Sequence, residues 1–368
     1  MQINIFGTPE IKIPKTEGIK YTGSKLKLLP YIIDAVKDLP ICSILDGFAG
    51  TTRVSQAFAK LGYQTTANDS SIWTKIFAET YLFSRPETAY YQELLNYLNN
   101  LKGEDGWFSL HYGGKGDERA KKPFQLHNTQ KLDAIRIEID KLGLPEADKS
   151  VLLTSLILAL DKVDNTLGHY VAYLANWSPR SYQTIELKLP LLNTFEQENK
   201  AYCADIFQTV QTNSFDLAYL DPPYGSNNEK MPPSRVRYAA YYHIWKTVIL
   251  NDQPMLFGKA NRRIDSKDGV AASIFEEFRK DTNDRFIAIQ AIETLINTVQ
   301  AKYILLSYSS GGRATKNDLL QMITNVGKLK HIYQLDYKKN VIAQMTWTQR
   351  WASEEEAHYE YLFLFEKD

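Results

Sequence analysis

The chain has 368 residues, 44% of them hydrophobic, and its 43 basic residues balance 43 acidic ones. This hydrophobic fraction is typical of a packed globular protein, and the length predicts one large core with an inserted or appended smaller unit. The charge balance excludes a global basic field, so a nucleic-acid partner would have to be bound by a local patch.

The N-terminal part of the chain shows strands alternating with helices. The segment CSILDGF, residues 42–48, predicts a short buried strand, and TTRVSQAFAKLG, residues 51–62, has apolar residues at the spacing of one helix face. A second strand is expected in YQTTAND, residues 63–69, and a second helix over residues 72–82. A unit of strand, helix and strand is the building block of a parallel sheet.

The pattern changes between about Arg85 and Lys200, where helices predominate. Apolar residues recur at helical spacing over residues 129–143 and 147–163, after a glycine-rich, charged loop. Strands resume after Lys200, at residues 201–206, 215–221, 302–310, 331–338 and 359–367, with a helix over 291–300. We therefore predict an α/β fold in which residues 1–84 and 201–368 form one domain and residues 85–200 form an inserted, mainly helical region.

Several predicted strands end on an acidic residue at the carboxyl edge, where open α/β sheets bind their ligands. Gly50 lies in the turn after the first strand, where a glycine lets the backbone approach a ligand at a helix N-terminus. Asp69 ends the next strand, where a carboxylate would accept hydrogen bonds from ribose hydroxyls. Asp205 is placed either to reach the adenine of a cofactor or to cap the following helix. This edge therefore predicts a site for a nucleoside-containing cofactor.

The two cysteines, Cys42 and Cys203, lie far apart in the sequence among apolar residues. They are expected to be small core residues in a reducing compartment rather than a disulfide or a metal site. The chain also shows no apolar segment of the roughly 18 to 20 residues that span a bilayer, and its N-terminus lacks the apolar core of a signal peptide. We therefore expect a soluble, cytoplasmic protein with no membrane partner.

Four segments resemble the DNA adenine-N6 methyltransferases of the Dam-like, alpha-ordered group. They occur in the order typical of that group and are YTGSK (21–25), DGFAGTT (46–52), Asn68 with Asp69, and DPPY (221–224). The stretches RVRYAAYYHIWKTV and ILLSYSS also resemble segments that follow the catalytic motif of the family. One departure is Thr52, where many members carry a further glycine. The resemblance implies a seven-stranded, mostly parallel, Rossmann-like methyltransferase sheet, with the inserted helices as the target-recognition region.

The resemblance also implies S-adenosylmethionine as the methyl donor. Tyr21 and Lys25 would then lie close to its methionine end, and Asp69 would bind its ribose. The full set of residues expected to bind the donor is Tyr21, Gly23, Lys25, Asp46, Phe48, Ala49, Gly50, Thr51, Asp69, Asp205 and Asp221. No metal is expected.

The DPPY segment has a chemical rationale of its own. The exocyclic amine of adenine is a poor nucleophile because its lone pair is delocalised into the ring. The carboxylate of Asp221 and the backbone carbonyl of Pro222 would accept hydrogen bonds from that amine, and two successive prolines, Pro222 and Pro223, hold both acceptors rigid. Tyr224 would stack on a base flipped out of the duplex, which offsets part of the unstacking cost. These four residues are the predicted catalytic group.

Basic residues outside these motifs are the predicted DNA contacts. Arg119, Lys121 and Lys122 form a cluster suited to phosphates, although most such clusters are solvated loops. Arg235 and Arg237 follow DPPY and are better placed to touch the backbone of a flipped nucleotide. Two further polar residues, Asn165 and His169, would line a DNA channel, or else cap a helix end and form a partly buried histidine site.

The resemblance and the DPPY chemistry predict a site-specific enzyme that methylates the N6 of adenine in double-stranded DNA. We expect it in the bacterial cytoplasm, paired with a restriction endonuclease that acts on the same site without direct contact. A cytosine-N4 methyltransferase remains an alternative, although its tetrapeptide usually begins with Ser. An RNA or protein methyltransferase, which more often has Asn at that position, and a catalytically silent DNA-binding regulator also remain open. The bases that are recognised cannot be assigned from the side chains.

Overall fold

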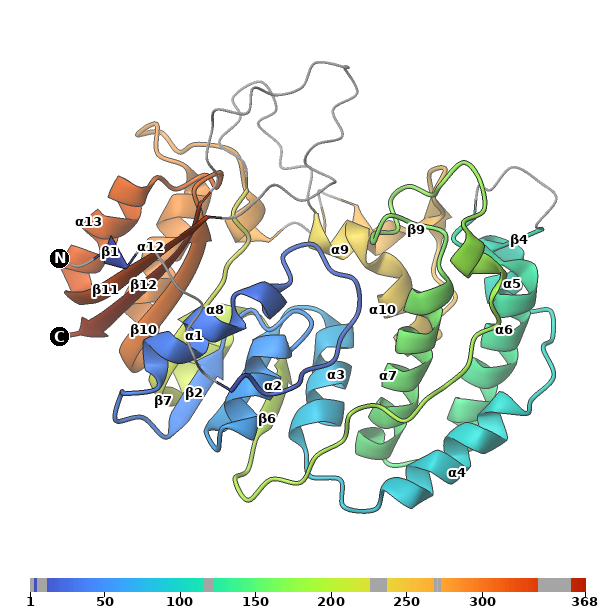
Figure 1. Ribbon diagram of the computed structural model, residues 1–368. Helices are drawn as coiled ribbons and strands as arrows, with labels where there is room; N and C mark the ends of the chain where they lie inside the picture. Colours follow the sequence, from blue (N-terminus) through green and yellow to red (C-terminus); the bar gives the residue numbers. More distant parts are fainter. Residues whose placement is uncertain are drawn as a thin grey trace.

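An eight-stranded sheet forms the centre of the molecule (Figure 1). The computed structural model describes residues 3–4, 12–115, 122–225, 237–267, 270, 273–336 and 359–368. The strand order is β1-β11-β12-β10-β7-β2-β3-β6. In chain order these strands are β1 (Ile3–Asn4), β2 (Ser43–Asp46), β3 (Gln64–Asp69), β6 (Lys200–Cys203), β7 (Ser214–Leu220), β10 (Gln300–Ser309), β11 (Gly327–Asp336) and β12 (Tyr359–Lys367).

Only one of these strands runs against its neighbours. Strand β12 pairs antiparallel with β10 and β11, and the other neighbouring pairs are parallel. The prediction of an α/β fold with a seven-stranded, mostly parallel sheet is confirmed for the seven longer strands. The two-residue β1 is an additional strand at one edge.

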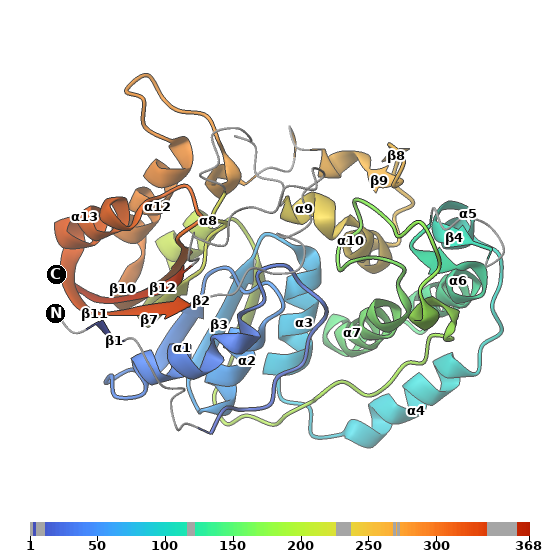
Figure 2. The same ribbon diagram turned by 45° about the horizontal axis from the view of Figure 1, so that its top comes forward.

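Helices cover both faces of the sheet (Figure 2). One face carries α1 (Leu29–Val36), α2 (Arg53–Lys60) and α3 (Ile72–Leu82), and the other carries α8 (Ile206–Thr212), α12 (Ile287–Thr298) and α13 (Lys316–Val326). In β7, Leu217 and Tyr219 pack in the core with α1 and α2, whereas Ala218 and Leu220 pack in the core with α8, α12 and α13. Successive strand residues point to opposite faces, so a strand covered on both sides is a continuous apolar run.

Two sequence-based expectations are corrected at the ends of strands. The strand predicted over 201–206 ends at Cys203, because the side chain of Asp205 accepts a hydrogen bond from the backbone of Phe207 (2.8 Å) and caps α8. The expectation that Cys42 and Cys203 are core residues is wrong, since both are exposed and neither is in a disulfide. Cys42 precedes β2, and Cys203 ends the edge strand β6.

The region between residues 85 and 200 is mainly helical. Its helices are α4 (Thr88–Asn99), α5 (Trp107–Tyr112), α6 (Leu126–Lys141), α7 (Glu146–Val163) and the 3-10 turn η2 (Pro179–Tyr182), with the short strands β4 (Gly113–Gly114) and β5 (Phe124–Gln125). A second segment follows β7 and contains α9 (Tyr238–Tyr241), α10 (His243–Leu250), β8 (Leu256–Phe257), β9 (Arg262–Arg263), η3 (Ile264–Ser266) and η4 (Ile274–Glu276). None of the helices that the structure describes is long and apolar enough to cross a membrane.

The inserted helices share one hydrophobic core with α3 and α10 (Figure 1). Its buried members include Phe77 of α3, Leu156 of α7 and Trp245 of α10. The insertion therefore packs against helices on both sides of it in the sequence. The division of the chain into residues 1–84 with 201–368, and 85–200, stays a prediction.

A buried arginine fastens the insertion to α10. Arg136 of α6 is 1% exposed, and it donates from Nε to the carbonyl of Val248 (2.6 Å) and from Nη2 to that of Ile249 (2.8 Å). These carbonyls lie in the last turn of α10, where no partner exists within the helix. Its Nη1 also pairs with Asp140 at 2.8 Å.

We predict that Arg136→Met lowers the free energy of unfolding by about 2–4 kcal/mol, because two buried carbonyls lose their donor and Asp140 keeps only its ion pair with Lys149. Urea denaturation followed by circular dichroism measures the change. Lys141→Met is the matched control on the same helix, since the Lys141 side chain is 68% exposed and should shift stability by less than about 0.5 kcal/mol. Equal stability of the two variants would contradict the prediction.

Candidate active site

A cavity of about 670 Å³ lies at the carboxyl ends of β2, β3, β6 and β7. This is the edge at which parallel α/β sheets bind ligands. The residues that the sequence predicted for the donor all line it, namely Tyr21, Gly23, Lys25, Asp46, Phe48, Ala49, Gly50, Thr51, Asp69, Asp205 and Asp221. The fold thus brings together residues that are up to 200 positions apart in the chain. Their role in binding stays a prediction.

The turn between β2 and α2 is tight and contains two left-handed residues. Gly50 has φ +47°, and a Cβ atom there would lie 3.2 Å from the ring of Tyr21. Thr52 has φ +59° and is fully buried, and its hydroxyl accepts a hydrogen bond from Gln56 (3.0 Å). A β-branched residue rarely adopts this conformation. Thr52 therefore keeps the backbone shape that a glycine would favour, and its side-chain contact helps to hold that shape.

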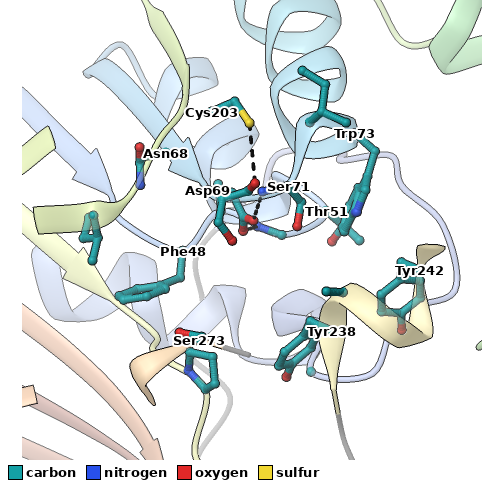
Figure 3. Close-up of a pocket in the computed structure, with 18 of the residues that line it drawn as sticks. Phe48, Thr51, Asn68, Asp69, Ser71, Trp73, Cys203, Tyr238, Tyr242 and Ser273 are labelled. Carbon is teal, nitrogen blue, oxygen red and sulfur yellow. Dashed lines mark hydrogen bonds between the residues drawn. The ribbon is translucent and has the colours of Figure 1, made fainter. Parts of the chain in front are cut away.

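Asp69 fastens this turn to the end of β3 (Figure 3). Its Oδ2 accepts from the backbone N–H of Gly50 (3.0 Å), and its Oδ1 accepts from that of Ser71 (2.9 Å). Burial raises the pKa of Asp69, and these backbone hydrogen bonds oppose the rise. Each carboxylate oxygen has two lone pairs, so both can still accept a hydrogen bond from a ligand.

Asp46 is the most deeply buried acid of the cavity wall, with 1% of its surface exposed. Its Oδ2 accepts from the Ser55 hydroxyl (2.6 Å), but its Oδ1 is buried without a hydrogen-bond partner. Burial raises the pKa of Asp46 from 3.8 to about 7. A buried oxygen without a partner is costly, so this atom is suited to a donor group on a bound ligand.

Two groups of aromatic rings line opposite sides of the cavity (Figure 3). On one side, Tyr21 stacks on Tyr242 (4.8 Å between centroids) and Tyr238 (5.5 Å) and lies 5.6 Å from Trp73. Burial raises the pKa of the Tyr21 hydroxyl well above its usual value, so it stays protonated. Sequence reasoning gave no role to Trp73, Tyr238 or Tyr242, although the dense aromatic spacing of residues 238–245 was a usable signal.

The opposite side of the cavity is an apolar wall. Phe48 meets Phe275 edge to face at 5.1 Å, and Phe275 stacks on Phe207 at 5.9 Å. Ile206 extends the wall at the start of α8. A flat apolar surface of this kind suits a planar ring such as a purine.

The DPPY segment follows β7 and meets three residues from distant parts of the chain. The Nζ of Lys25 lies 2.6 Å from Oδ2 of Asp221 and 3.8 Å from Oε1 of Glu360. The Tyr224 hydroxyl lies 2.5 Å from Oδ1 of Asp221 and also contacts Oε1 of Glu360. Ser307 of β10 donates to the same Glu360 oxygen (3.1 Å). The end of β7 is therefore a cluster of two carboxylates, one ammonium and two hydroxyls.

The four DPPY residues differ in how they face the cavity. Asp221 and Pro223 line it, and Pro222 is buried. The centroid of the Tyr224 ring lies 4.8 Å from that of Tyr308. The Lys25 ammonium lies 5.1 Å from the centroid of the Tyr224 ring. The stacking role of Tyr224 stays a prediction, and it requires Lys25 to leave the ring.

Sequence reasoning missed Glu360 and Ser307. Glu360 lies on β12, is 5% exposed, and burial raises the pKa of its carboxyl group. The signal in the sequence was an acid inside the otherwise apolar strand YEYLFLFEK, because a buried acid needs specific partners.

The predicted DNA contacts are only partly within the described residues. Arg119, Lys121 and Arg235 lie outside them. Lys122 donates to the carbonyl of His111 (2.6 Å), and Arg237 donates from Nη1 to that of Glu276 (2.9 Å). These bonds are internal, so contact with DNA stays a prediction for both residues.

The two polar residues considered for a DNA channel lie after α7. Asn165 is fully buried and holds the following loop, accepting from the backbone of Ser178 (2.8 Å) and donating to Leu174 (3.4 Å). His169 packs against the ring of Tyr241 at 4.6 Å, and burial lowers the pKa of its imidazole. Asn165 thus holds the loop rather than capping the end of α7, where Asp164 is the C-cap, whereas His169 is partly buried, as its structural alternative states.

We predict that ionisation of Asp46 weakens the free protein. Because its pKa is higher in the folded state, its contribution to stability is present below about pH 4 and is lost as the pH rises through about 7. Relative to Asp46→Asn, the wild type should lose about 2–4 kcal/mol of unfolding free energy between pH 4 and 8, measured by urea denaturation.

Asp216 provides the control of opposite sign. Hydrogen bonds from the backbone of Cys42 and Ser43 (2.8 Å each) lower its pKa, so its contribution is present at neutral pH and is lost on acidification. The difference in unfolding free energy between Asp216→Asn and the wild type should therefore stay constant between pH 5 and 8. A difference between the wild type and Asp46→Asn that is constant with pH would refute the Asp46 prediction.

Comparison with known proteins identifies the family of the chain. The model of the D12 class N6 adenine-specific DNA methyltransferases matches residues 21–302. The chain is 29% identical over 342 residues to the Modification methylase StsI of Streptococcus sanguinis, covering 87% of this chain and 48% of StsI. It is 27% identical over 359 residues to the Type II methyltransferase M.NlaIII of Neisseria lactamica, covering 95% and 99% of the two chains.

A further relative is the Type II methyltransferase M.FokI of Planomicrobium okeanokoites, 25% identical over 370 residues, with 95% of this chain and 53% of M.FokI covered. The chain thus spans about half the length of StsI and M.FokI and nearly all of M.NlaIII. The resemblance based on the four sequence motifs is confirmed. The chain belongs to the D12 class N6 adenine-specific DNA methyltransferase family.

Proposed function

We propose that this chain transfers a methyl group from S-adenosylmethionine to the N6 of an adenine flipped out of a specific sequence in double-stranded DNA. The observation that carries the proposal is the position of Asp221, whose carboxylate follows β7 on a stiff Pro-Pro segment and lines the same cavity as Asp46 and Asp69. The donor and the acceptor of the methyl group would therefore meet at one edge of the sheet.

The cavity fits the donor that the family and the fold imply, S-adenosylmethionine. Its volume of about 670 Å³ is in the range of small-molecule sites. The unpartnered Oδ1 of Asp46 would accept from the amino group of the methionine end, and Asp69 would accept from the ribose hydroxyls. Phe48 and Phe275 offer an apolar wall to the adenine ring. When bound, this group supplies an electrophilic methyl group.

The residues of the chain would act on the target base in two ways. The carboxylate of Asp221 and the carbonyl of Pro222 would accept hydrogen bonds from the amino group of the base and draw electron density toward N6. This acceptance strengthens as charge develops on the nitrogen, so it favours the transition state over the bound substrate. The aromatic side formed by Tyr21, Tyr238 and Tyr242 would exclude water from the reacting atoms.

Recognition of DNA is proposed for the region 85–200, with phosphate contacts from Arg119, Lys121, Lys122, Arg235 and Arg237. The names of StsI and M.NlaIII describe them as a modification methylase and a Type II methyltransferase. By analogy, a restriction endonuclease would recognise the same sequence as this chain without touching it. A DNA substrate would place the enzyme in the cytoplasm of a bacterial cell.

We predict that Asp69→Ala weakens binding of S-adenosylmethionine by at least about tenfold, because the ribose acceptor and the anchor of the Gly50 turn are both lost. Isothermal titration calorimetry measures the affinity. Asp216→Ala is the matched control, since Asp216 also accepts from two backbone N–H groups but lies outside the cavity. Unchanged affinity in Asp69→Ala would remove this residue from the donor site.

We predict that Asp221→Ala lowers the rate of methyl transfer by about 100- to 1000-fold or more while donor affinity changes little, because one of two charge-stabilising acceptors is removed. The purified protein is incubated with labelled donor and DNA, and the DNA is digested to nucleosides. Label in N6-methyladenine is expected for the wild type. Label in cytosine or in no nucleoside would overturn the proposed function, and full activity of the variant would overturn the role of Asp221.

A further inference from the structure

The ammonium group of Lys25 covers both groups that the target adenine would use. It lies 2.6 Å from Asp221 Oδ2, the proposed acceptor of the amine, and 5.1 Å from the centroid of Tyr224, the proposed stacking surface. The Lys25 side chain is only 9% exposed. An adenine cannot enter this position until the ammonium has moved.

Glu360 lies where the displaced ammonium would go. Its Oε1 is 3.8 Å from Lys25 Nζ, so the ammonium already lies within ion-pair distance of both carboxylates and keeps Glu360 as a partner when it leaves Asp221. Glu360 is held in place by its strand: β12 lies between β10 and β11, and Glu360 is opposite Ser309 on one side and Leu335 on the other. The hydroxyl of Ser307 also donates to Oε1 (3.1 Å).

Among the residues that the structure describes, the ion pairs at this point join one ammonium to two carboxylates. The buried Glu360 and the partly buried Asp221 share the Lys25 ammonium, and a buried charge is strongly destabilised without a partner. The Tyr224 hydroxyl contacts both carboxylates but has a single proton to donate. When Lys25 pairs with Glu360, the Tyr224 hydroxyl can donate its proton to Asp221 alone. Asp221 then keeps one hydrogen bond, and its Oδ2 can accept from the base.

We infer that Glu360 is a positioning residue for methyl transfer: it receives the Lys25 ammonium when the target adenine enters and so frees Asp221 to accept from the amine. This inference rests on the proposed function. It gives β12, the strand closest to the C-terminus, a role in opening the site for the target adenine.

The exchange depends on the charge of Glu360. Burial raises the pKa of its carboxyl group. Within the described part of the chain, the titratable groups that face it are Lys25, Asp221, Tyr224, Tyr219 and Tyr238. A protonated Glu360 has no charge to attract the ammonium, so lowering the pH through its pKa should slow methyl transfer. The rate would therefore fall on the acid side at a higher pH than an ordinary glutamate would cause.

The test is Glu360→Gln, which keeps the size of the side chain and removes its charge. We expect the single-turnover rate of adenine methylation to fall by about tenfold, because Asp221 is released in a smaller fraction of the complexes. The dissociation constants for S-adenosylmethionine and for DNA should stay within about twofold of the wild type. The acid-side fall in rate that Glu360 causes should be absent in the variant.

Glu366→Gln is the matched control on the same strand, because Glu366 pairs with Lys330 on the surface (2.9 Å) and lies far along β12 from the site. It should retain the rate and the pH profile of the wild type. Glu360→Asp should recover part of the rate, since it restores the charge on a shorter side chain.

The outcomes separate the inference from the proposed function. If the wild type forms N6-methyladenine and Glu360→Gln does so at the same rate, the inference is overturned and the proposed function stands. A loss of rate that is equal at every pH and accompanied by weaker donor binding would show a structural role for Glu360 and would also overturn the inference. A wild type that forms no N6-methyladenine would overturn both.

Discussion

One ammonium group joins three distant parts of the chain. Lys25 lies shortly before α1, Asp221 follows β7, and Glu360 lies on β12. Because the side chain is almost fully buried, this contact fixes the N-terminal segment against the carboxyl edge of the sheet. The segment in turn carries Tyr21, whose ring covers the Gly50 turn and stacks on Tyr238 and Tyr242. The ionic contact and the aromatic side of the cavity therefore belong to the same N-terminal segment.

The cavity is short of positive charge. Burial raises the pKa of Asp46 and Asp69, which line the cavity, so the negative charge of each carboxylate is incompletely compensated in the free protein. S-adenosylmethionine carries a positive sulfonium, a positive ammonium and a negative carboxylate, so its net charge is positive. Binding of such a ligand would compensate the buried acids, so the groups that cost stability in the free protein are the ones that would favour the donor.

The features that depend on local sequence pattern could be predicted from the sequence alone. The apolar run before Asp221 predicted a strand, and the order of the four motifs predicted the family. Glu360 was missed because its function depends on a contact over more than 100 residues of chain, which no local pattern encodes. Cys42 and Cys203 were misjudged because apolar neighbours in sequence do not show that a residue lies at a strand end. The left-handed Thr52 was visible only as a departure from a glycine pattern.

The contact of Arg136 with the end of α10 has a consequence for the coupling of the two ligands. Helix α10 follows α9, which carries Tyr238 into the donor cavity, and Arg136 belongs to the region proposed to read DNA. A shift of α6 on the duplex would therefore reach the aromatic wall through a rigid chain of packed helices. Thermodynamic linkage makes such an effect reciprocal: whatever correct DNA does to donor affinity, the donor must do equally to the affinity for correct DNA.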